Sequence, residues 1–98
     1  MQIEMPTDGY TVYTKSGCNY CIKLKDLFEE KNIECKYINC DEYIKNKENK
    51  EEFLTHMKRL TDHKTFPMVF YDKICIGGFT ETKQFIEIIE MEYEFKFD

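Results

Sequence analysis

The chain has 98 residues, of which 42% are hydrophobic and 15% aromatic, and it carries a formal net charge of −5. This length allows one small folded domain and excludes two. The acidic balance argues against general binding to nucleic acid or anionic membranes, and no stretch approaches the ~18 apolar residues of a membrane-spanning helix, so we expect a soluble, cytoplasmic protein.

The N-terminal part of the chain predicts a strand followed by a helix. Residues 10–14 are rich in β-branched and aromatic side chains and follow a turn signal at residues 8–9, which favours a strand. Apolar side chains then recur with helical spacing over residues 18–31. Asn32 suits the end of this helix, because asparagine tolerates the left-handed conformation found there.

The middle of the chain predicts a second strand and a second helix. Residues 34–40 alternate loosely and contain aromatic and branched side chains, which indicates a strand. A highly charged run follows over residues 41–52, and we interpret it as a loop, the solvated face of a helix, or both. Apolar residues with helical spacing over residues 53–60 predict a helix that ends near residue 63.

The C-terminal part predicts a hairpin and a third helix. Two short strands, at residues 68–71 and 73–76, have the spacing of a hairpin, and two glycines at residues 77–78 end the second strand. Thr80 suits the N-cap of the third helix, with Glu81 in the first turn. The expected buried face of this helix comprises Phe85, Ile86, Ile89 and Tyr93.

The predicted element order is βαβαββα, which indicates an α/β fold. The first two strands are parallel, joined by a right-handed crossover, and the last two are antiparallel. Three helices must then cover both faces of a four-stranded mixed sheet. We expect a single domain over residues 1–98, with residues 1–8 as a short N-terminal extension and residues 94–98 as a C-terminal tail that packs partly on the body.

Cys18 and Cys21 stand three residues apart at the expected start of the first helix. Thiols at this spacing can close a small disulfide ring, and the unpaired N–H groups of a helix start stabilise a thiolate. The chain has five cysteines, an odd number without the density of a secreted disulfide scaffold, so a reducing compartment is expected. Redox sites and zinc sites share the CxxC spacing, and the pair alone does not separate them.

The remaining cysteines and histidines argue against a metal site. Cys35 and Cys40 are five apart on the second expected strand, so their side chains face opposite sides of the sheet. Cys75 lies on the last strand and is expected as a small buried hydrophobe. His56 and His63 lie near the end of the second helix, where surface or capping roles are expected. We therefore predict no protein-only metal site.

Three separated motifs resemble those of the glutaredoxin family. Residues 18–21 read CNYC, residues 65–67 read TFP and residues 76–81 read IGGFTE, where the family has CPYC, TVP and a Gly–Gly motif. They occur in the family's order and spacing, and the resemblance covers residues 10–93. It implies a thioredoxin fold and a glutathione-dependent oxidoreductase that reduces protein–glutathione mixed disulfides and protein disulfides.

The resemblance also implies roles for particular residues. Cys18 would be the nucleophile and Cys21 the resolving thiol, with glutathione as the co-substrate. A cis Pro67 would leave the backbone of Phe66 free to pair with glutathione, as in β-strand addition. Backbone N–H groups at the third helix start would bind the γ-glutamyl carboxylate, and Lys15 the glycine carboxylate. The expected glutathione-binding residues are Lys15, Tyr20, Lys64, Thr65, Phe66, Pro67, Gly78, Phe79, Thr80 and Glu81.

Two positions depart from the family pattern. Leu54 stands where many members have a polar residue that helps to bind the glycine carboxylate, and Lys64 is expected to take over that role. Asn19 stands where dithiol members usually have proline. Some members that lack this proline hold a [2Fe–2S] cluster between two subunits, through their first cysteine and glutathione. A cluster carrier or sensor that uses Cys18 is thus the alternative function.

The oligomeric state follows from the choice between these functions. A reductase is expected to be a monomer, and a dimer is expected only if a cluster is bound. A third hypothesis is a thioredoxin-fold module that serves protein contacts alone. The intact cysteine pair and the three glutathione elements favour the reductase.

Overall fold

The computed structural model describes residues 1–95, with the side chains of residues 1–92. The secondary structure elements are β1 (Tyr10–Thr14), α1 (Asn19–Glu30), β2 (Cys35–Asn39), the short 3-10 helix η1 (Asp41–Ile44), α2 (Lys47–Lys58), β3 (Met68–Tyr71), β4 (Ile74–Gly77) and α3 (Phe79–Phe95). Apart from η1, this is the predicted βαβαββα order. Within the described residues, no helix is both long and apolar enough to cross a membrane.

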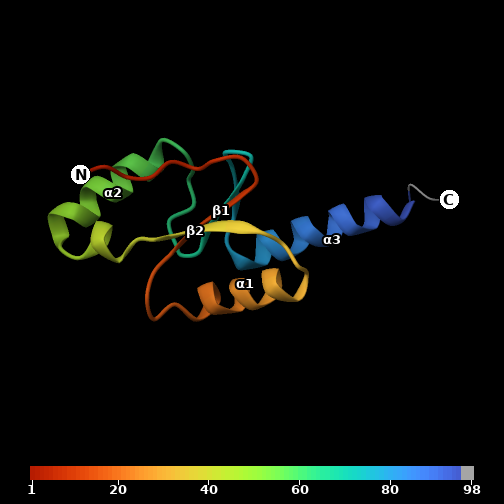
Figure 1. Cartoon of the computed structure of the whole chain (residues 1–98). Coiled ribbons are helices and arrows are strands. Elements are labelled where there is room, and N and C mark those ends of the chain that lie inside the picture. The colour runs from red at the N-terminus through yellow and green to blue at the C-terminus, as the bar shows by residue number, and fades with distance from the viewer. Residues whose placement is uncertain (96–98) are drawn as a thin grey trace.

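The four strands form one mixed sheet in the order β2–β1–β3–β4. β1 pairs parallel to β2 and antiparallel to β3, and β3 pairs antiparallel to β4. Parallel neighbours need a long crossover, and α1 supplies it. Figure 1 shows α1 and α3 together on one side of the sheet and α2 on the other. The predicted thioredoxin fold is confirmed.

One face of the sheet packs against α2. Tyr13 of β1 and Met68 and Phe70 of β3 point to this face, where they meet Phe53 and Met57 of α2. All five side chains are 0–2% exposed. Burial of one such side chain contributes roughly 1.5–3 kcal/mol, so this layer holds α2 firmly against β1, which leads to the cysteine pair, and β3, which follows Pro67.

The opposite face packs against α1 and α3. Val12 and Val69 alternate with the residues of the first layer, as the two-residue period of a strand requires. They contact Leu24 and Phe28, which lie one turn apart on α1, and Ile86 of α3. The start of α1, where the cysteines lie, is therefore fixed by a hydrophobic face on its own helix.

Two turns that the sequence predicts are present in the structure. Asn32 follows α1 with φ +56°, and its N–H and that of Ile33 bond to the carbonyls of Glu29 and Phe28, which is the Schellman arrangement. The β3–β4 turn has positive φ at both Asp72 and Lys73, as a type I′ hairpin requires. The first turn fixes where β2 begins, and the second fixes where β4 begins.

The second helix begins earlier than the apolar spacing predicts. Asn46 is its N-cap, and the Asn46 Oδ1 accepts a 2.9 Å hydrogen bond from the N–H of Asn49. The charged run thus contains η1 and the first turns of α2, and the residues between Lys47 and Glu52 are mostly exposed. The interpretation as a solvated helix face is correct for this part of the run.

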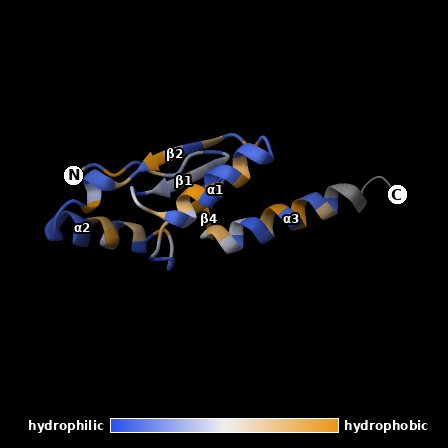
Figure 2. Ribbon diagram, turned by 90° about the horizontal axis from the view of Figure 1, so that it is seen from below, coloured by the Kyte–Doolittle hydropathy of each residue, from blue (hydrophilic) through white to orange (hydrophobic). Residues whose placement is uncertain are grey.

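The third helix differs from the prediction at both ends. It begins at Phe79, so Thr80 lies in its first turn and the predicted N-cap role of Thr80 is wrong. Ile86 is buried, but Ile89 is 41% exposed because α3 extends well beyond the sheet (Figures 1 and 2). The helix continues through residues 94 and 95 of the expected tail, whereas residues 96–98 and the side chain of Tyr93 lie outside the described part.

Candidate functional site

The cysteine pair lies at the N-terminal end of α1. Cys18 is the N-cap residue, with extended backbone (φ −101°, ψ 107°), and its Sγ accepts a 3.1 Å hydrogen bond from the backbone N–H of Cys21. The two residues form a disulfide, with their Cα atoms 5.2 Å apart. A helix N–H that points at a sulfur favours the thiolate once the bond is reduced. This contact distinguishes Cys18 from Cys21, whose sulfur receives no such hydrogen bond from the described residues.

Accessibility does not distinguish the two cysteines in this disulfide form. Cys18 is 8% exposed and Cys21 is 7% exposed. The position of Cys18 at the very start of the helix suggests that it is the more accessible thiol, but the two exposed fractions are nearly equal. The asymmetry of the pair lies in its hydrogen bonding, since the N–H of one cysteine is directed at the sulfur of the other.

The loop between β1 and α1 is tied down by a carboxylate from another element. Asp41, the first residue of η1, accepts hydrogen bonds from the backbone N–H and the hydroxyl of Ser16. These bonds hold the pKa of Asp41 below its ordinary value. The N–H of Asp41 in turn donates to Asn39 Oδ1. The loop that leads into Cys18 is thus anchored to the end of β2, a contact that sequence reasoning missed.

A cis peptide bond lies at the entry to β3, the strand that pairs with β1. The bond between Phe66 and Pro67 is cis, as predicted, and Pro67 is buried. The Phe66 ring stacks on Phe53 at a centroid distance of 6.1 Å, and the Lys15 Nζ lies 5.9 Å from the Phe66 ring centroid. Within residues 1–95, the N–H and C=O of Phe66 make no hydrogen bond to another backbone group. They are available to an added strand.

The start of α3 presents both signs of charge. Gly78 precedes the helix, and its N–H donates a 2.8 Å hydrogen bond to Oε1 of Glu81, which reaches back as in a capping box. Gly77 has φ +131°, and a Cβ there would lie 2.8 Å from Glu81 Oε1. Free N–H groups of the first turn attract an anion, while the Glu81 carboxylate attracts a cation. This end can therefore bind a zwitterion.

An aromatic pair joins the starts of α1 and α3. The rings of Tyr20 and Phe79 have centroids 5.9 Å apart, and Lys23 Nζ lies 4.8 Å from the Tyr20 ring centroid. Tyr20 is 54% exposed, so most of its ring remains available to a ligand. The two predicted site residues are thus brought together from positions 59 apart in the chain.

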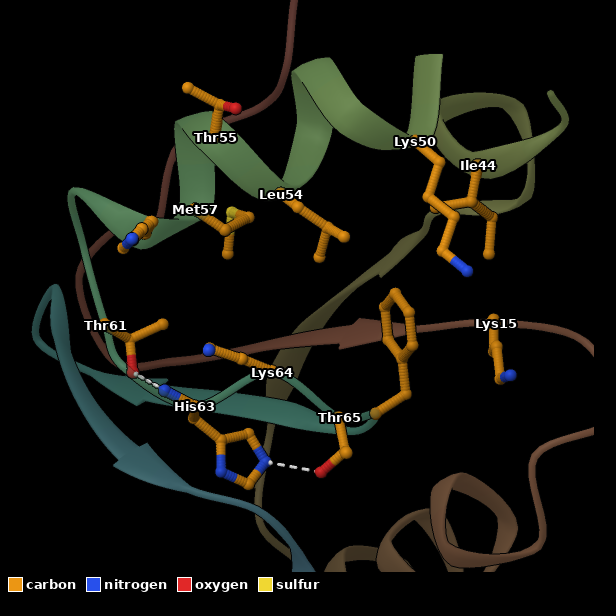
Figure 3. Close-up of a pocket in the computed structure, with 12 residues that line it drawn as sticks. Lys15, Ile44, Lys50, Leu54, Thr55, Met57, Thr61, His63, Lys64 and Thr65 are labelled. Atoms are coloured by element: carbon orange, nitrogen blue, oxygen red, sulfur yellow. Dashed lines mark hydrogen bonds between the residues drawn. The ribbon is translucent and has the colours of Figure 1, made fainter. Parts of the chain in front are cut away.

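A basic cavity of about 640 Å³ lies between α2 and the segment before β3 (Figure 3). Its wall includes the predicted site residues Lys15, Lys64, Thr65 and Phe66. Leu54 of α2 supplies apolar surface to the same cavity, as Figure 3 shows. No carboxylate lies among the described residues that line it. The cavity therefore favours an anionic group. Lys64, which is expected to take over the role of the polar residue missing at Leu54, lies in its wall.

His63 lies between two of the predicted site segments. The His63 Nε2 is 3.3 Å from the hydroxyl of Thr65, and the backbone N–H of His63 donates a hydrogen bond to Thr61 Oγ1 (Figure 3). A Cβ on Gly78 would lie 3.1 Å from the imidazole ring. The ring therefore joins the segment before β3 to the start of α3. The sequence suggests only a surface or capping role, because the contact with Gly78 exists only in the folded chain.

The other three cysteines are free, and none has the environment of Cys18. Cys40 is fully buried on the α2 face, and burial raises the pKa of its thiol to about 12. Cys35 packs on the opposite face, as predicted, and burial also raises its pKa. Cys75 is half-buried against the α2-side core. Within residues 1–95, no three His, Cys, Asp or Glu side chains group to hold a metal ion.

Comparison with known proteins agrees with this geometry. The family model described as Glutaredoxin matches residues 10–76. The chain belongs to the glutaredoxin family. Glutaredoxin 1 of Rickettsia felis is 39% identical over 67 residues, which cover 68% of this chain and 61% of that protein. The matched part therefore spans about three fifths of the length of this relative.

Solved structures of the family have the same fold. Glutaredoxin 1 from Francisella tularensis, complexed with cacodylate, superposes with a TM-score of 0.68 at 32% identity, over 83% of this chain and 94% of that one. A buckwheat glutaredoxin–glutathione complex superposes with a TM-score of 0.64 at 23% identity, over 79% of this chain and 66% of that one. The thioredoxin-like arrangement of sheet and helices in this chain is thus that of the family.

Proposed function

We propose that the protein is a glutathione-dependent thiol–disulfide oxidoreductase that reduces protein–glutathione mixed disulfides and protein disulfides. The observation that carries this proposal is the cysteine pair at the start of α1, with the N–H of Cys21 directed at the Sγ of Cys18. The cis Pro67 supports it, because the adjoining backbone of Phe66 is available to a peptide. The reported complex of a related buckwheat protein with glutathione adds support for the ligand.

The two ends of the site differ in charge in the way that the two ends of glutathione differ. The γ-glutamyl end carries an ammonium and a carboxylate, which suit the Glu81 side chain and the N–H groups at the start of α3. The glycine end carries a lone carboxylate, which suits the basic cavity with Lys15 and Lys64. Glutathione therefore lies across the site with its cysteine beside Phe66 and Pro67.

Reduction of a glutathione mixed disulfide needs one thiolate of the protein. The Cys18 thiolate attacks the glutathione sulfur, a Cys18–glutathione disulfide forms, and the target protein leaves as a thiolate that takes up a proton. A second glutathione, as thiolate, then attacks the sulfur of the bound glutathione. The products are glutathione disulfide and the regenerated Cys18 thiolate.

Reduction of a protein disulfide needs both cysteines. Cys18 attacks one sulfur of the substrate and forms a mixed disulfide, and one substrate thiolate leaves. The Cys21 thiolate attacks the Cys18 sulfur, which releases the second substrate thiolate and forms the Cys18–Cys21 disulfide seen in the structure. Two glutathione molecules then reduce this bond in two exchanges and leave as glutathione disulfide.

The attack by Cys18 depends on thiolate stabilisation by the helix start. A free thiol with a pKa near 8.5 is only about 3% ionised at pH 7. The helix dipole contributes about 0.3–1 kcal/mol to the thiolate, or up to ~2 kcal/mol when it is partly buried. A hydrogen bond from the Cys21 N–H to a charged sulfur contributes about 1.5–3 kcal/mol more. Together these contributions favour the thiolate of Cys18 over its thiol.

A hydroxyethyl-disulfide reduction assay with glutathione tests the proposal. Wild type should turn over, Cys18→Ser should lose at least ~100-fold in rate, and Cys21→Ser should keep reduction of glutathione mixed disulfides while it loses most reduction of protein disulfides. The Cys75→Ser variant is the control, since this thiol lies outside the pair. Equal turnover by wild type and Cys18→Ser would contradict the assignment of the nucleophile.

The cluster-carrier alternative remains a prediction from Asn19 and is tested separately. A [2Fe–2S] cluster at Cys18 would need further ligands from glutathione and a second subunit, because the described part of this chain groups no set of three ligating side chains. Anaerobic reconstitution with iron, sulfide and glutathione should leave the protein colourless and monomeric if it is a reductase alone. A brown dimer whose absorption is lost on Cys18→Ser would establish the alternative. For either function we propose a reducing compartment, the cytoplasm.

A further inference from the structure

The basic cavity extends beyond what the glycine carboxylate of glutathione requires. Besides Lys15 and Lys64, its wall contains Lys50 and Lys58, which lie eight residues apart on α2 with Leu54 midway between them. Residues spaced by four share one face of a helix, so α2 presents a Lys–Leu–Lys stripe to the cavity. Both lysines are exposed, and neither is in an ion pair with another described residue.

The positive charge of this cavity contrasts with the negative net charge of the whole chain. The protein carries a net charge of −5, yet four of its lysines and no carboxylate line this cavity among the described residues. Figure 3 shows Lys50 over the side of the cavity near Ile44 and Lys15, and Lys64 on the opposite wall. An anionic ligand that enters the cavity is therefore attracted from several sides.

The direction of a bound peptide follows from the unequal ends of the site. The start of α3, with Glu81, accepts the zwitterionic end of glutathione, whereas Lys15 and Lys64 accept its terminal carboxylate. A protein segment that pairs with the Phe66 backbone in the same direction places its reacting cysteine beside Pro67. The residues that follow this cysteine then enter the basic cavity. Glutathione ends after one such residue, but a protein chain continues.

The dimensions of the stripe match a short extended segment. Eight residues of helix between Lys50 and Lys58 span about 12 Å. An extended chain advances about 3.3 Å per residue, so three or four residues of a substrate would cover this length. Leu54 offers apolar contact between the two charged groups.

Resting on the reductase function proposed above, we propose that the basic cavity selects disulfide substrates with acidic residues directly after the reacting cysteine. Lys50 and Lys58 bind those acidic side chains, and they determine specificity for proteins without taking part in the reaction. Glutathionylated substrates do not use the stripe, because glutathione itself occupies the site and ends at Lys15 and Lys64. The preference is therefore specific to the protein-disulfide reaction.

Three synthetic peptide disulfides of equal length test this proposal. One has two glutamates directly after the reacting cysteine, one has them directly before it, and one has glutamines at both places. At low ionic strength, kcat/KM of wild type should be about 3- to 10-fold higher for the first peptide than for the other two, since an exposed ion pair contributes about 0.2–1 kcal/mol. The preference should shrink at 0.5 M salt.

Lys50→Gln/Lys58→Gln should lose this preference while it turns over hydroxyethyl disulfide with glutathione as wild type does. The matched control is Lys25→Gln/Lys47→Gln, which removes the same charge from exposed lysines outside the cavity and should keep the preference. Fluorescence anisotropy of the acidic peptides with serine in place of cysteine measures binding without the reaction. The affinities of the serine peptides should follow the same order as the kcat/KM values.

The possible failures are distinguishable. Equal efficiency with glutamates before and after the cysteine, or an unchanged preference in Lys50→Gln/Lys58→Gln, would overturn the specificity proposal and leave the reductase function intact. Absence of turnover with every peptide and with hydroxyethyl disulfide would overturn the reductase function, and the specificity proposal with it. Equal affinities of the serine peptides in the anisotropy measurement would also count against the cavity as the binding site.

Discussion

Both carboxylate oxygens of Asp41 accept hydrogen bonds from Ser16, one from its backbone N–H at 2.9 Å and one from its hydroxyl. Ser16 lies two residues before Cys18, so the first residue of η1 holds the loop that leads into the cysteine pair. A carboxylate that receives two hydrogen bonds is stabilised in its charged form. This explains why the pKa of Asp41 is lowered.

Asp41→Asn should lower Tm at pH 7, because the amide accepts a hydrogen bond but lacks the charge. The pKa of Asp41 is lower in the folded state than in the unfolded state. Its contribution to stability is therefore complete above about pH 4 and is lost as pH falls through the folded-state pKa. Thermal unfolding over a series of pH values from 7 downwards measures the difference between the two proteins, which should shrink as the Asp41 carboxylate is protonated. Asp62→Asn, at an exposed position, is the control.

Gly77→Ala should destabilise the protein by about 2–4 kcal/mol, because φ +131° is unfavourable for alanine and the new Cβ would overlap Glu81. Gly9→Ala provides a matched control, since Gly9 also has positive φ (+73°) but no atom within 4 Å of an added Cβ. That change should cost only about 1–2 kcal/mol. Urea unfolding of the two variants measures the difference. Equal losses would show that contact with Glu81 adds nothing.

Most of the fold could be predicted because its signals are local. The helix end at Asn32 and the first hairpin-turn position at Asp72 need positive φ, which asparagine and aspartate tolerate, and the structure has it at those positions. The start of α2 was missed because residues 47–52 are almost wholly polar, and only the cap at Asn46 marks it. Solvated first turns carry no apolar period to detect.

The site could be predicted only where a motif exists. The cysteine pair, the cis Pro67 and the glycines before α3 each have a sequence pattern. The contact of Asp41 with Ser16 joins residues 25 apart, and that of His63 with Gly78 joins residues 15 apart. No local pattern predicts either, because both depend on how separate elements pack. The equal burial of the two cysteines was also hidden, since spacing says nothing about exposure.

Glu81→Gln should separate the two roles of this side chain. The glutamine oxygen can still accept the 2.8 Å hydrogen bond from the Gly78 N–H, so the free energy of unfolding should change by less than ~0.5 kcal/mol. The lost charge should raise KM for glutathione about 3- to 10-fold with little change in kcat, because ground-state and transition-state binding fall together. Steady-state kinetics and urea unfolding measure the two effects. A large loss of stability with unchanged KM would assign Glu81 to capping alone.

The cysteines of the reduced protein should react with iodoacetamide in a defined order. Cys18 should be alkylated first at pH 7, since its thiolate is stabilised by the N–H of Cys21. Cys40 should not react until the protein unfolds, because it is fully buried and its pKa is raised to about 12. Mass spectrometry of peptides taken at successive times gives the order. Modification of Cys40 as early as Cys18 would contradict the structure.

Phe53→Ala should be among the most destabilising changes in α2. The Phe53 ring is fully buried and is stacked between Tyr43 and Phe66, at centroid distances of 5.5 and 6.1 Å. Removal of a buried phenylalanine costs about 3–5 kcal/mol.

Thr55→Ala, an exposed change on the same helix, is the control and should cost less than ~0.5 kcal/mol. Because Phe66 precedes the cis proline, Phe53→Ala should also raise KM for glutathione in the fraction that stays folded. Urea unfolding and kinetics at low temperature test both effects. If the free energy of unfolding fell by less than ~1 kcal/mol, the neighbouring rings would have filled the space left by the Phe53 ring, and Phe66 would not depend on Phe53 for support.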